Sequence, residues 1–146
     1  MLPRSTLLHP IAGLGCDMTR ILVADDSEVV RRSVCELLRL VSDFQVVGEA
    51  ADGSEAIARA AELLPDVVLL DVQMPNINGI GAVKEILDAA PNASIIFLTQ
   101  YASRHFGSEA RRIGAHGYVT KAHVSTCLIH AIECAIEHQF YSSVTT

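Results

Sequence analysis

Hydrophobic residues in this chain fall into two patterns, which are short unbroken runs and longer stretches with helical spacing. Unbroken apolar runs are typical of strands that are covered on both faces, as in a parallel sheet. Three clear runs of this kind predict buried strands, at Ile21 to Ala24, Val67 to Leu70 and Ser94 to Leu98. Two weaker runs, Phe44 to Glu49 and Gly117 to Val119, complete a predicted set of five strands.

Segments with apolar residues three and four positions apart follow the predicted strands. The clearest amphipathic face consists of Val30, Val34, Leu37, Leu38 and Val41. Further helices are predicted at about Ser54 to Leu64, Gly79 to Ala90, Ser103 to Ile113 and His123 to His138. Pro65 and Pro91 end two of them, because proline cannot continue a helix. This regular alternation predicts an α/β fold with a doubly wound, five-stranded parallel sheet.

The length of 146 residues suits one domain that can bury a core without disulfides or metals. Half of the residues are hydrophobic but only 5% are aromatic, so the core must consist mainly of Val, Ile, Leu and Ala. We expect residues 19–139 to form the domain, residues 1–18 to be a disordered extension, and residues 140–146 to be a tail. The net charge of −6, without a block of Lys or Arg, argues against direct binding of DNA or of an anionic membrane.

The cysteines and the N-terminal residues bear on the cellular compartment. The four cysteines include no CxxC pair and have no His at metal-ligand spacing, so we predict reduced thiols. No apolar run before Asp17 is long enough for a secretory signal or a membrane span. The segment Gly13-Leu14-Gly15-Cys16 also lacks the hydrophobic stretch that precedes a lipoprotein cysteine. We therefore expect a cytoplasmic protein.

Polar residues follow four of the predicted strands at the carboxyl edge of the sheet, where doubly wound folds bind their ligands. These residues are Asp25-Asp26-Ser27, Asp71, Thr99 and Thr120-Lys121. Three carboxylates brought together would repel one another and have raised pKa values unless a cation joined them. Magnesium suits such a site, because it prefers oxygen ligands and is held by one or two carboxylates together with a phosphate.

Phosphoryl transfer is the chemistry that these residue types support. Lys121 supplies a positive charge and Thr99 a hydroxyl donor for the transferred oxygens, so Asp71 is the predicted nucleophile that forms an acyl phosphate. Each residue alone has an ordinary explanation, since an Asp after a strand often caps a helix and a lone Lys is usually solvated. Their joint placement at the strand ends of one sheet favours the functional interpretation.

Several segments resemble the receiver domains of bacterial two-component response regulators, over about residues 20–139. They are ILVADDS at 21–27, PDVVLLDVQMP at 65–75, Gly79, Leu98-Thr99 and GAHGYVTK at 114–121. The resemblance implies a flavodoxin-like (βα)5 receiver fold and a phosphorylation-dependent signalling switch. A histidine kinase or phosphotransfer protein would donate the phosphoryl group to Asp71, with Mg²⁺ required. The domain would not be an enzyme but would assist its own phosphorylation and dephosphorylation.

The resemblance also implies roles for individual residues. Asp26 would bind Mg²⁺ directly, Asp25 largely through a metal-bound water, and Gln73 through its backbone carbonyl, beside Asp71 itself. Thr99 and Tyr118 would form a switch pair, in which the threonine moves toward the phosphoryl group while the aromatic ring turns inward. That movement would bias the surface of the fourth helix, fifth strand and fifth helix, where a downstream protein or a second copy would bind.

Some positions depart from the family pattern or stay ambiguous. Ala122 follows Lys121 where many relatives have a proline in a cis peptide, so we expect either a strained cis bond, which costs about 3 kcal/mol, or a different local loop. Gln100 stands where a small residue is common, which leaves the phosphoryl lifetime open. Gly107 weakens the fourth helix by roughly 1 kcal/mol relative to alanine. Arg31 and Arg32 are interpreted as part of a solvated helix face, in preference to a contact with an acidic kinase surface.

Other functions compete with a stand-alone receiver. The residues from Ala135 to Ser143 resemble the junction between a receiver and a helix-turn-helix DNA-binding domain, so the chain is alternatively the receiver fragment of a transcription factor. An aspartyl phosphohydrolase of the haloacid dehalogenase type shares the chemistry, but it places its nucleophile first, in a DxD motif. A flavodoxin-like nucleotide binder would have a glycine-rich loop after the first strand, where this chain has acidic residues.

Overall fold

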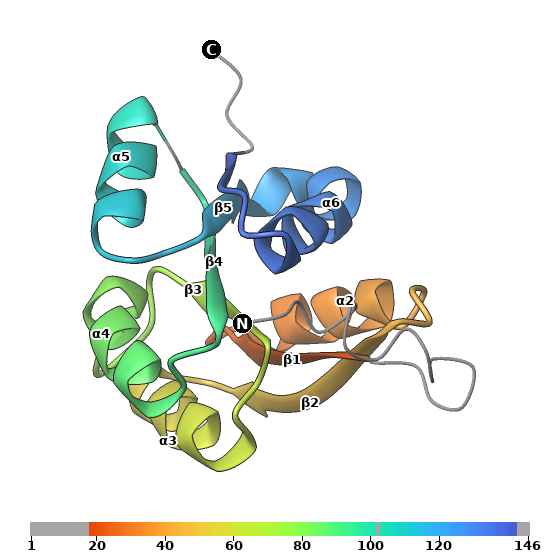
Figure 1. Cartoon of the computed structure of the whole chain (residues 1–146), viewed down its shortest axis with the longest axis horizontal. Coiled ribbons are helices and arrows are strands. Elements are labelled where there is room, and N and C mark those ends of the chain that lie inside the picture. The colour runs from red at the N-terminus through yellow and green to blue at the C-terminus, as the bar shows by residue number, and fades with distance from the viewer. Residues whose placement is uncertain (1–17, 102, 143–146) are drawn as a thin grey trace.

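The computed structural model describes residues 18–101 and 103–142, so most of the predicted N-terminal extension, with Cys16, and the last four residues lie outside it. Six strands are present in this part of the chain (Figure 1): β1 Thr19–Ala24, β2 Phe44–Ala50, β3 Val67–Asp71, β4 Ser94–Thr99, β5 Gly117–Thr120 and β6 Tyr141–Ser142. The α-helices are α2 Glu28–Leu38, α3 Gly53–Leu63, α4 Gly79–Ala89, α5 Arg104–Arg112 and α6 Val124–Ile136, and the 3₁₀ helix η2 covers Lys121–His123.

The strands form one parallel sheet in the order β2-β1-β3-β4-β5-β6. This order confirms the doubly wound α/β fold, in which the direction of winding changes between β1 and β3. The sheet has one strand more than the five expected. The additional strand, β6, is formed by two residues that the sequence had assigned to the C-terminal tail.

Helices cover both faces of the sheet (Figure 1), with α2 and α6 on one side and α3, α4 and α5 on the other. Alternate residues of each strand point to opposite faces, and both faces are buried. In β4, for example, Ile95 and Phe97 pack toward α4 and α5, whereas Ile96 and Leu98 pack toward α2 and α6. The unbroken apolar runs in the sequence therefore reflect two separate cores, one on each side of the sheet.

Short polar side chains fix where four helices begin. Ser27, Asp52, Asn78 and Ser103 each accept a hydrogen bond from the backbone N–H three residues further on. Such caps satisfy amide groups that have no partner inside the helix. Among the described helices, none is long and apolar enough to cross a membrane. The described cysteines are free thiols, as predicted.

A buried histidine next to β4 gives the fold a pH dependence. The Nδ1 atom of His116 accepts a hydrogen bond from the Ile95 N–H at 3.0 Å, which requires the neutral ring. Burial, with a smaller effect of the neighbouring His138, lowers the pKa of His116. As the pH falls through about 6.5, the His116 ring is therefore protonated in the unfolded chain before it is protonated in the folded protein. This difference favours the unfolded chain, so the free energy of unfolding decreases.

We expect the variant His116→Gln to lose less stability than the wild type between pH 7.5 and pH 5.5, because its amide oxygen accepts the same bond without titrating. Urea denaturation at several pH values measures this difference. The control is His130→Gln, since the His130 side chain is 67% exposed. An unchanged pH slope in His116→Gln would contradict the assignment.

Candidate functional site

The site lies at the carboxyl edge of the sheet, where the predicted residues come together. β1 and β3 are hydrogen-bonded neighbours, so Asp25, which follows β1, lies next to Asp71, which ends β3. Lys121 is brought to the same edge because it begins η2 directly after β5. Thr99 ends β4, between β3 and β5.

The three carboxylates form one cluster with a lysine beside it. Asp25, Asp26 and Asp71 each place an oxygen within 4.8 Å of the others. Asp25 is fully buried and Asp71 is 2% exposed, whereas Asp26 lies at the surface. The ammonium group of Lys121 lies 2.9 Å from Asp25 Oδ2 and 3.3 Å from Asp71 Oδ1. Burial opposes the charge of Lys121, but the two carboxylates outweigh it and raise the pKa of the lysine.

The two oxygens of Asp71 have different surroundings. Oδ1 accepts a hydrogen bond from the Gln73 N–H at 3.2 Å and pairs with Lys121. Oδ2 is buried and has no hydrogen-bond partner among the described residues. Burial, together with the negative charge of Asp25, raises the pKa of Asp71 to about 6, although Lys121 and the Gln73 N–H act in the opposite direction. Oδ2 is therefore the oxygen of Asp71 whose lone pairs are not engaged by a hydrogen bond from the described residues.

The cluster fits a hard divalent cation. It offers carboxylate oxygens, of which the buried Asp71 Oδ2 has no hydrogen-bond partner among the described residues and Asp25 Oδ2 has only its ion pair with Lys121, and a single lysine does not balance the three negative charges. Magnesium binds to oxygen ligands of this kind. Asp25, Asp26 and Asp71 are thus placed where they can hold Mg²⁺, while the role of the Gln73 carbonyl stays a prediction.

An arginine that the sequence assigned to a solvated helix face holds the acidic turn after β1. Arg31 donates through Nη1 to the backbone carbonyl of Asp25 at 2.6 Å and through Nε to Glu49 at 3.1 Å. The turn is further fixed by the Ser27 N–H, which donates to Asp25 Oδ1 at 2.8 Å. The expectation of a solvated Arg31 was therefore wrong. It fits the neighbouring Arg32 instead, whose exposed side chain pairs with Glu28.

Gly79 lets α4 start against the backbone of Asp71. A Cβ atom at this position would lie 2.2 Å from the carbonyl oxygen of Asp71. The Gly79 N–H also donates to the carbonyl of Val72 at 2.9 Å. Only glycine leaves α4 this close to the strand end, which explains why this glycine belongs to the family pattern.

The expected switch pair is divided between two environments. The Thr99 hydroxyl is largely buried and donates to the backbone carbonyl of Tyr101 at 2.8 Å. Tyr118 is 1% exposed, so its ring already points inward, edge-on to Phe106 and Phe140. The arrangement thus combines an inward tyrosine with a threonine that is bonded to its own loop.

The loops beside the site include the Lys121–Ala122 peptide, for which the sequence left two alternatives open. The Lys121–Ala122 peptide is not cis, and the chain continues from β5 into η2. The second alternative, a different local loop, is therefore the one observed. Gln100 and Tyr101 are both exposed next to Thr99, and Tyr101 keeps 84% of its surface accessible.

Residues 21–133 match the family described as response regulator receiver domain. The uncharacterized transcriptional regulatory protein YxjL of Bacillus subtilis is 41% identical over 119 residues, which cover 82% of this chain and 55% of YxjL. The response regulator GacA of Pseudomonas viridiflava is 36% identical over 126 residues, which cover 86% of this chain and 59% of GacA. The chain thus spans less than two thirds of these relatives.

Solved structures show the same fold. A LuxR-family two-component response regulator from Aurantimonas sp. SI85-9A1 superimposes with a TM-score of 0.80 at 33% identity, covering 85% of this chain and 89% of that one. The response regulator domain of Thermotoga maritima CheB superimposes with a TM-score of 0.76 at 33% identity, covering 82% and 97%.

The charge cluster makes a prediction for stability. The folded protein holds the Asp71 proton up to about pH 6, whereas an unfolded Asp releases it near pH 4, so stability without Mg²⁺ falls as the pH rises through this window. We expect Asp71→Asn to raise the free energy of unfolding at pH 7.5 by about 1 to 3 kcal/mol without Mg²⁺ and to reduce the stabilisation by Mg²⁺.

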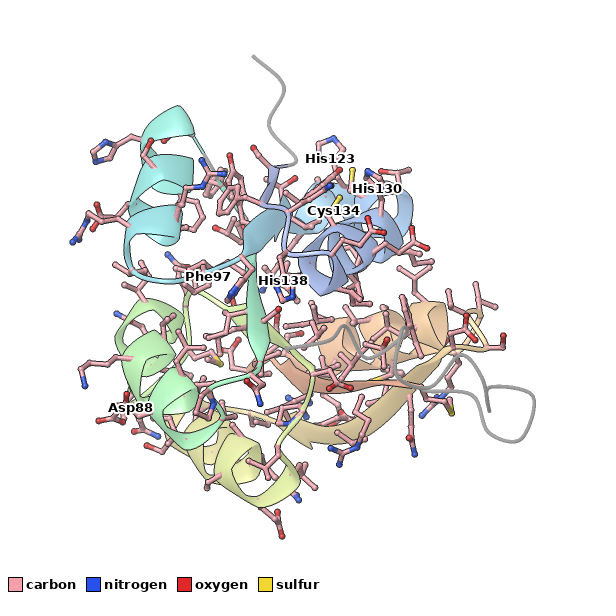
Figure 2. The ribbon with its side chains drawn as sticks, in the orientation of Figure 1. Asp88, Phe97, His123, His130, Cys134 and His138 are labelled. Atoms are coloured by element: carbon pink, nitrogen blue, oxygen red, sulfur yellow. The ribbon has the colours of Figure 1, made fainter. Side chains whose placement is uncertain are left out.

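Urea denaturation with and without Mg²⁺ measures both effects. Asp88→Asn is the matched control, because Asp88 projects outward from α4 (Figure 2) and pairs only with the exposed Lys84 among the described residues. Equal responses of the two variants would show that the cluster is not repulsive.

The contact of Arg31 predicts a specific loss of metal affinity. Arg31→Lys keeps the charge, but a lysine lacks the planar guanidinium group whose Nε and Nη1 atoms donate to Glu49 and to the Asp25 carbonyl at the same time. We expect its dissociation constant for Mg²⁺ to rise by about threefold to tenfold. Isothermal titration calorimetry measures the affinity, with Arg32→Lys as the control of equal charge. Equal affinities of the two variants would refute a positioning role for Arg31.

Proposed function

The chain belongs to the response regulator receiver domain family, the phosphoacceptor switches of two-component signalling, and we propose that Asp71 is its phosphoacceptor. A histidine kinase or a phosphotransfer protein is the proposed donor. The phosphorus–nitrogen bond of the donor histidine breaks, and a bond forms between phosphorus and Asp71 Oδ2. The product is an acyl phosphate on the domain and a free histidine on the donor.

The observation that carries this proposal is the buried oxygen Oδ2 of Asp71, which lacks a hydrogen-bond partner among the described residues. The opposite oxygen is held by the Gln73 N–H and by Lys121, which orients the carboxylate toward an incoming phosphorus. Mg²⁺, when bound by Asp25, Asp26 and Asp71, would neutralise charge on the transferred oxygens. Positioning and charge neutralisation then supply the rate enhancement, because a carboxylate is a weak nucleophile.

Two residues of the chain would act on the phosphoryl group after transfer. Lys121 would keep its ion pair with Asp25 and turn its remaining charge toward the phosphoryl oxygens. Thr99 would exchange the carbonyl of Tyr101 for a phosphoryl oxygen, since a hydroxyl donates one hydrogen bond at a time. The domain would thereby assist its own phosphorylation, and the exposed Gln100 would influence how fast water removes the group.

The proposed output surface is formed by α5, β5 and α6. Its partner is a downstream protein or a second copy of the domain, because the acidic chain has no cluster of basic residues for DNA. YxjL and GacA are named as regulators and are longer than this chain. The chain is therefore either a receiver that signals through protein contacts or the receiver part of a DNA-binding regulator. In both cases we expect it to act in the cytoplasm.

Phosphorylation by a small-molecule donor tests the proposal. We expect incubation with acetyl phosphate and Mg²⁺ to add one phosphoryl group to the wild type and none to Asp71→Asn, because the asparagine amide cannot form an acyl phosphate. Intact-mass spectrometry measures the adduct, and Asp88→Asn should be phosphorylated like the wild type. An adduct of equal amount on Asp71→Asn would refute Asp71 as the acceptor.

A further inference from the structure

The residues after α6 turn back and extend the sheet. His138 has a left-handed backbone (φ of 62°), and the Gln139 N–H donates to the carbonyl of Cys134 at 2.8 Å, which ends the helix and reverses the chain. β6 then runs parallel to β5 along the sheet edge between α5 and α6 (Figure 1). The Tyr141 N–H donates to the carbonyl of His116 at 3.3 Å. We call residues Phe140, Tyr141 and Ser142 the docked segment.

Glycine at position 117 permits this close approach. A Cβ atom there would lie 2.9 Å from the carbonyl oxygen of Tyr141 and 3.2 Å from its nitrogen. The pairing of Gly117 with Tyr141 also sets Tyr118 opposite Ser142. The register of β6 is thus matched to the position of the switch tyrosine.

The docked segment completes the environment of Tyr118. The Ser142 hydroxyl donates to the Tyr118 hydroxyl at 2.7 Å. The ring of Phe140 lies edge-on to the tyrosine ring with centroids 6.3 Å apart, and Arg111 covers Phe140 at 4.6 Å. A buried tyrosine needs a partner for its polar end, and here the segment that follows the domain provides one.

Gly107 makes room for the inward ring from the opposite side. A Cβ atom at this position of α5 would lie 3.0 Å from Tyr118 Cε1 and 3.2 Å from its hydroxyl oxygen. The sequence suggested only that Gly107 weakens the helix. The structure shows that the Tyr118 ring packs into the space that a side chain at position 107 would occupy.

We infer that Ser142 is a positioning residue for Tyr118, so that docking of residues 140–142 on β5 and the inward orientation of the tyrosine are one coupled equilibrium. The link to signalling rests on the proposed function, in which phosphorylation of Asp71 favours the inward ring. Coupling of this kind is reciprocal, so whatever favours the inward ring also favours the docked segment by the same factor. The phosphorylation state is thereby passed to the chain beyond Ser142 through a hydrogen bond inside the domain.

Amide hydrogen exchange of the full chain, followed by NMR at Tyr141, tests the coupling without any phosphoryl donor. We expect Ser142→Ala and Tyr118→Phe each to speed this exchange by about fivefold, the effect of one ordinary hydrogen bond, and the double variant to be no faster than either single one. Tyr101→Phe is the control, because its side chain is exposed and far from β6 in the sequence. Additive effects, or no effect of Tyr118→Phe, would overturn the inference.

Gly107→Ala tests the same coupling without removing a hydrogen-bonding group. Alanine stabilises a helix relative to glycine, so a merely structural effect would slow exchange. We expect faster exchange at Tyr141 instead, because the new methyl group presses on the inward ring. Unchanged or slower exchange would overturn the inference.

Beryllium trifluoride with Mg²⁺, a phosphoryl mimic, tests the link to signalling, with its binding followed by fluorine NMR. On the bound protein we expect slower exchange at Tyr141 in the wild type and loss of this response in Ser142→Ala and Tyr118→Phe. No response in the wild type with the mimic bound, or a full response in the variants, would overturn the link. The two proposals can fail independently. If Asp71 is not the acceptor, acetyl phosphate gives no adduct on Asp71, while Ser142→Ala and Tyr118→Phe still show coupled exchange at Tyr141.

Discussion

Repulsion among carboxylates at one edge of the sheet is the interaction on which the rest of the domain depends. β1 and β3 are adjacent in the sheet although α2, β2 and α3 lie between them in the sequence. This strand order brings Asp25 and Asp71 together. Lys121 offsets part of the negative charge, and a divalent cation would offset the remainder. The arrangement that raises the pKa of Asp71 therefore also opposes folding, a conflict that is common where function is built into a fold.

The buried central strands of the sheet, β1, β3, β4 and β5, determine which parts of the molecule can respond. They pack against helices on both faces, and close-packed interiors do not deform gradually. A change at Asp71 must therefore travel through side chains and through elements that are held by fewer buried groups. α5 is such an element, since Ala110 is its one buried residue among those whose side chains are described. Tyr118 lies between this helix and β6, the shortest strand of the sheet.

Much of the fold and most of the site could be predicted from the sequence, because both depend on local patterns. Strands buried on both faces leave unbroken apolar runs, and ligands of such folds collect at the strand ends, which led directly to Asp71 and Lys121. β6 escaped prediction because two residues are too few to show a period. Arg31 was missed because nothing in the sequence distinguishes it from Arg32, and only the approach of β2 gives it a partner. Gly107 was explained by helix propensity, whereas its neighbour in space is a tyrosine eleven positions away.

Occupation of the β5 edge by β6 also limits how the domain can join with others through its sheet. An unpaired edge strand is a template for a strand from another chain and is the usual route to aggregation of β-sheets. With β6 in place, β2 is the unpaired edge of the long strands in the described part of the chain. There, the register with β1 shifts between Ile21 and Leu22, and the exposed Glu49 carries a charge. Irregular pairing and charge both discourage growth of the sheet at the β2 edge. At the opposite edge β6 occupies β5, so the short strand after α6 also helps to keep domains from pairing edge to edge.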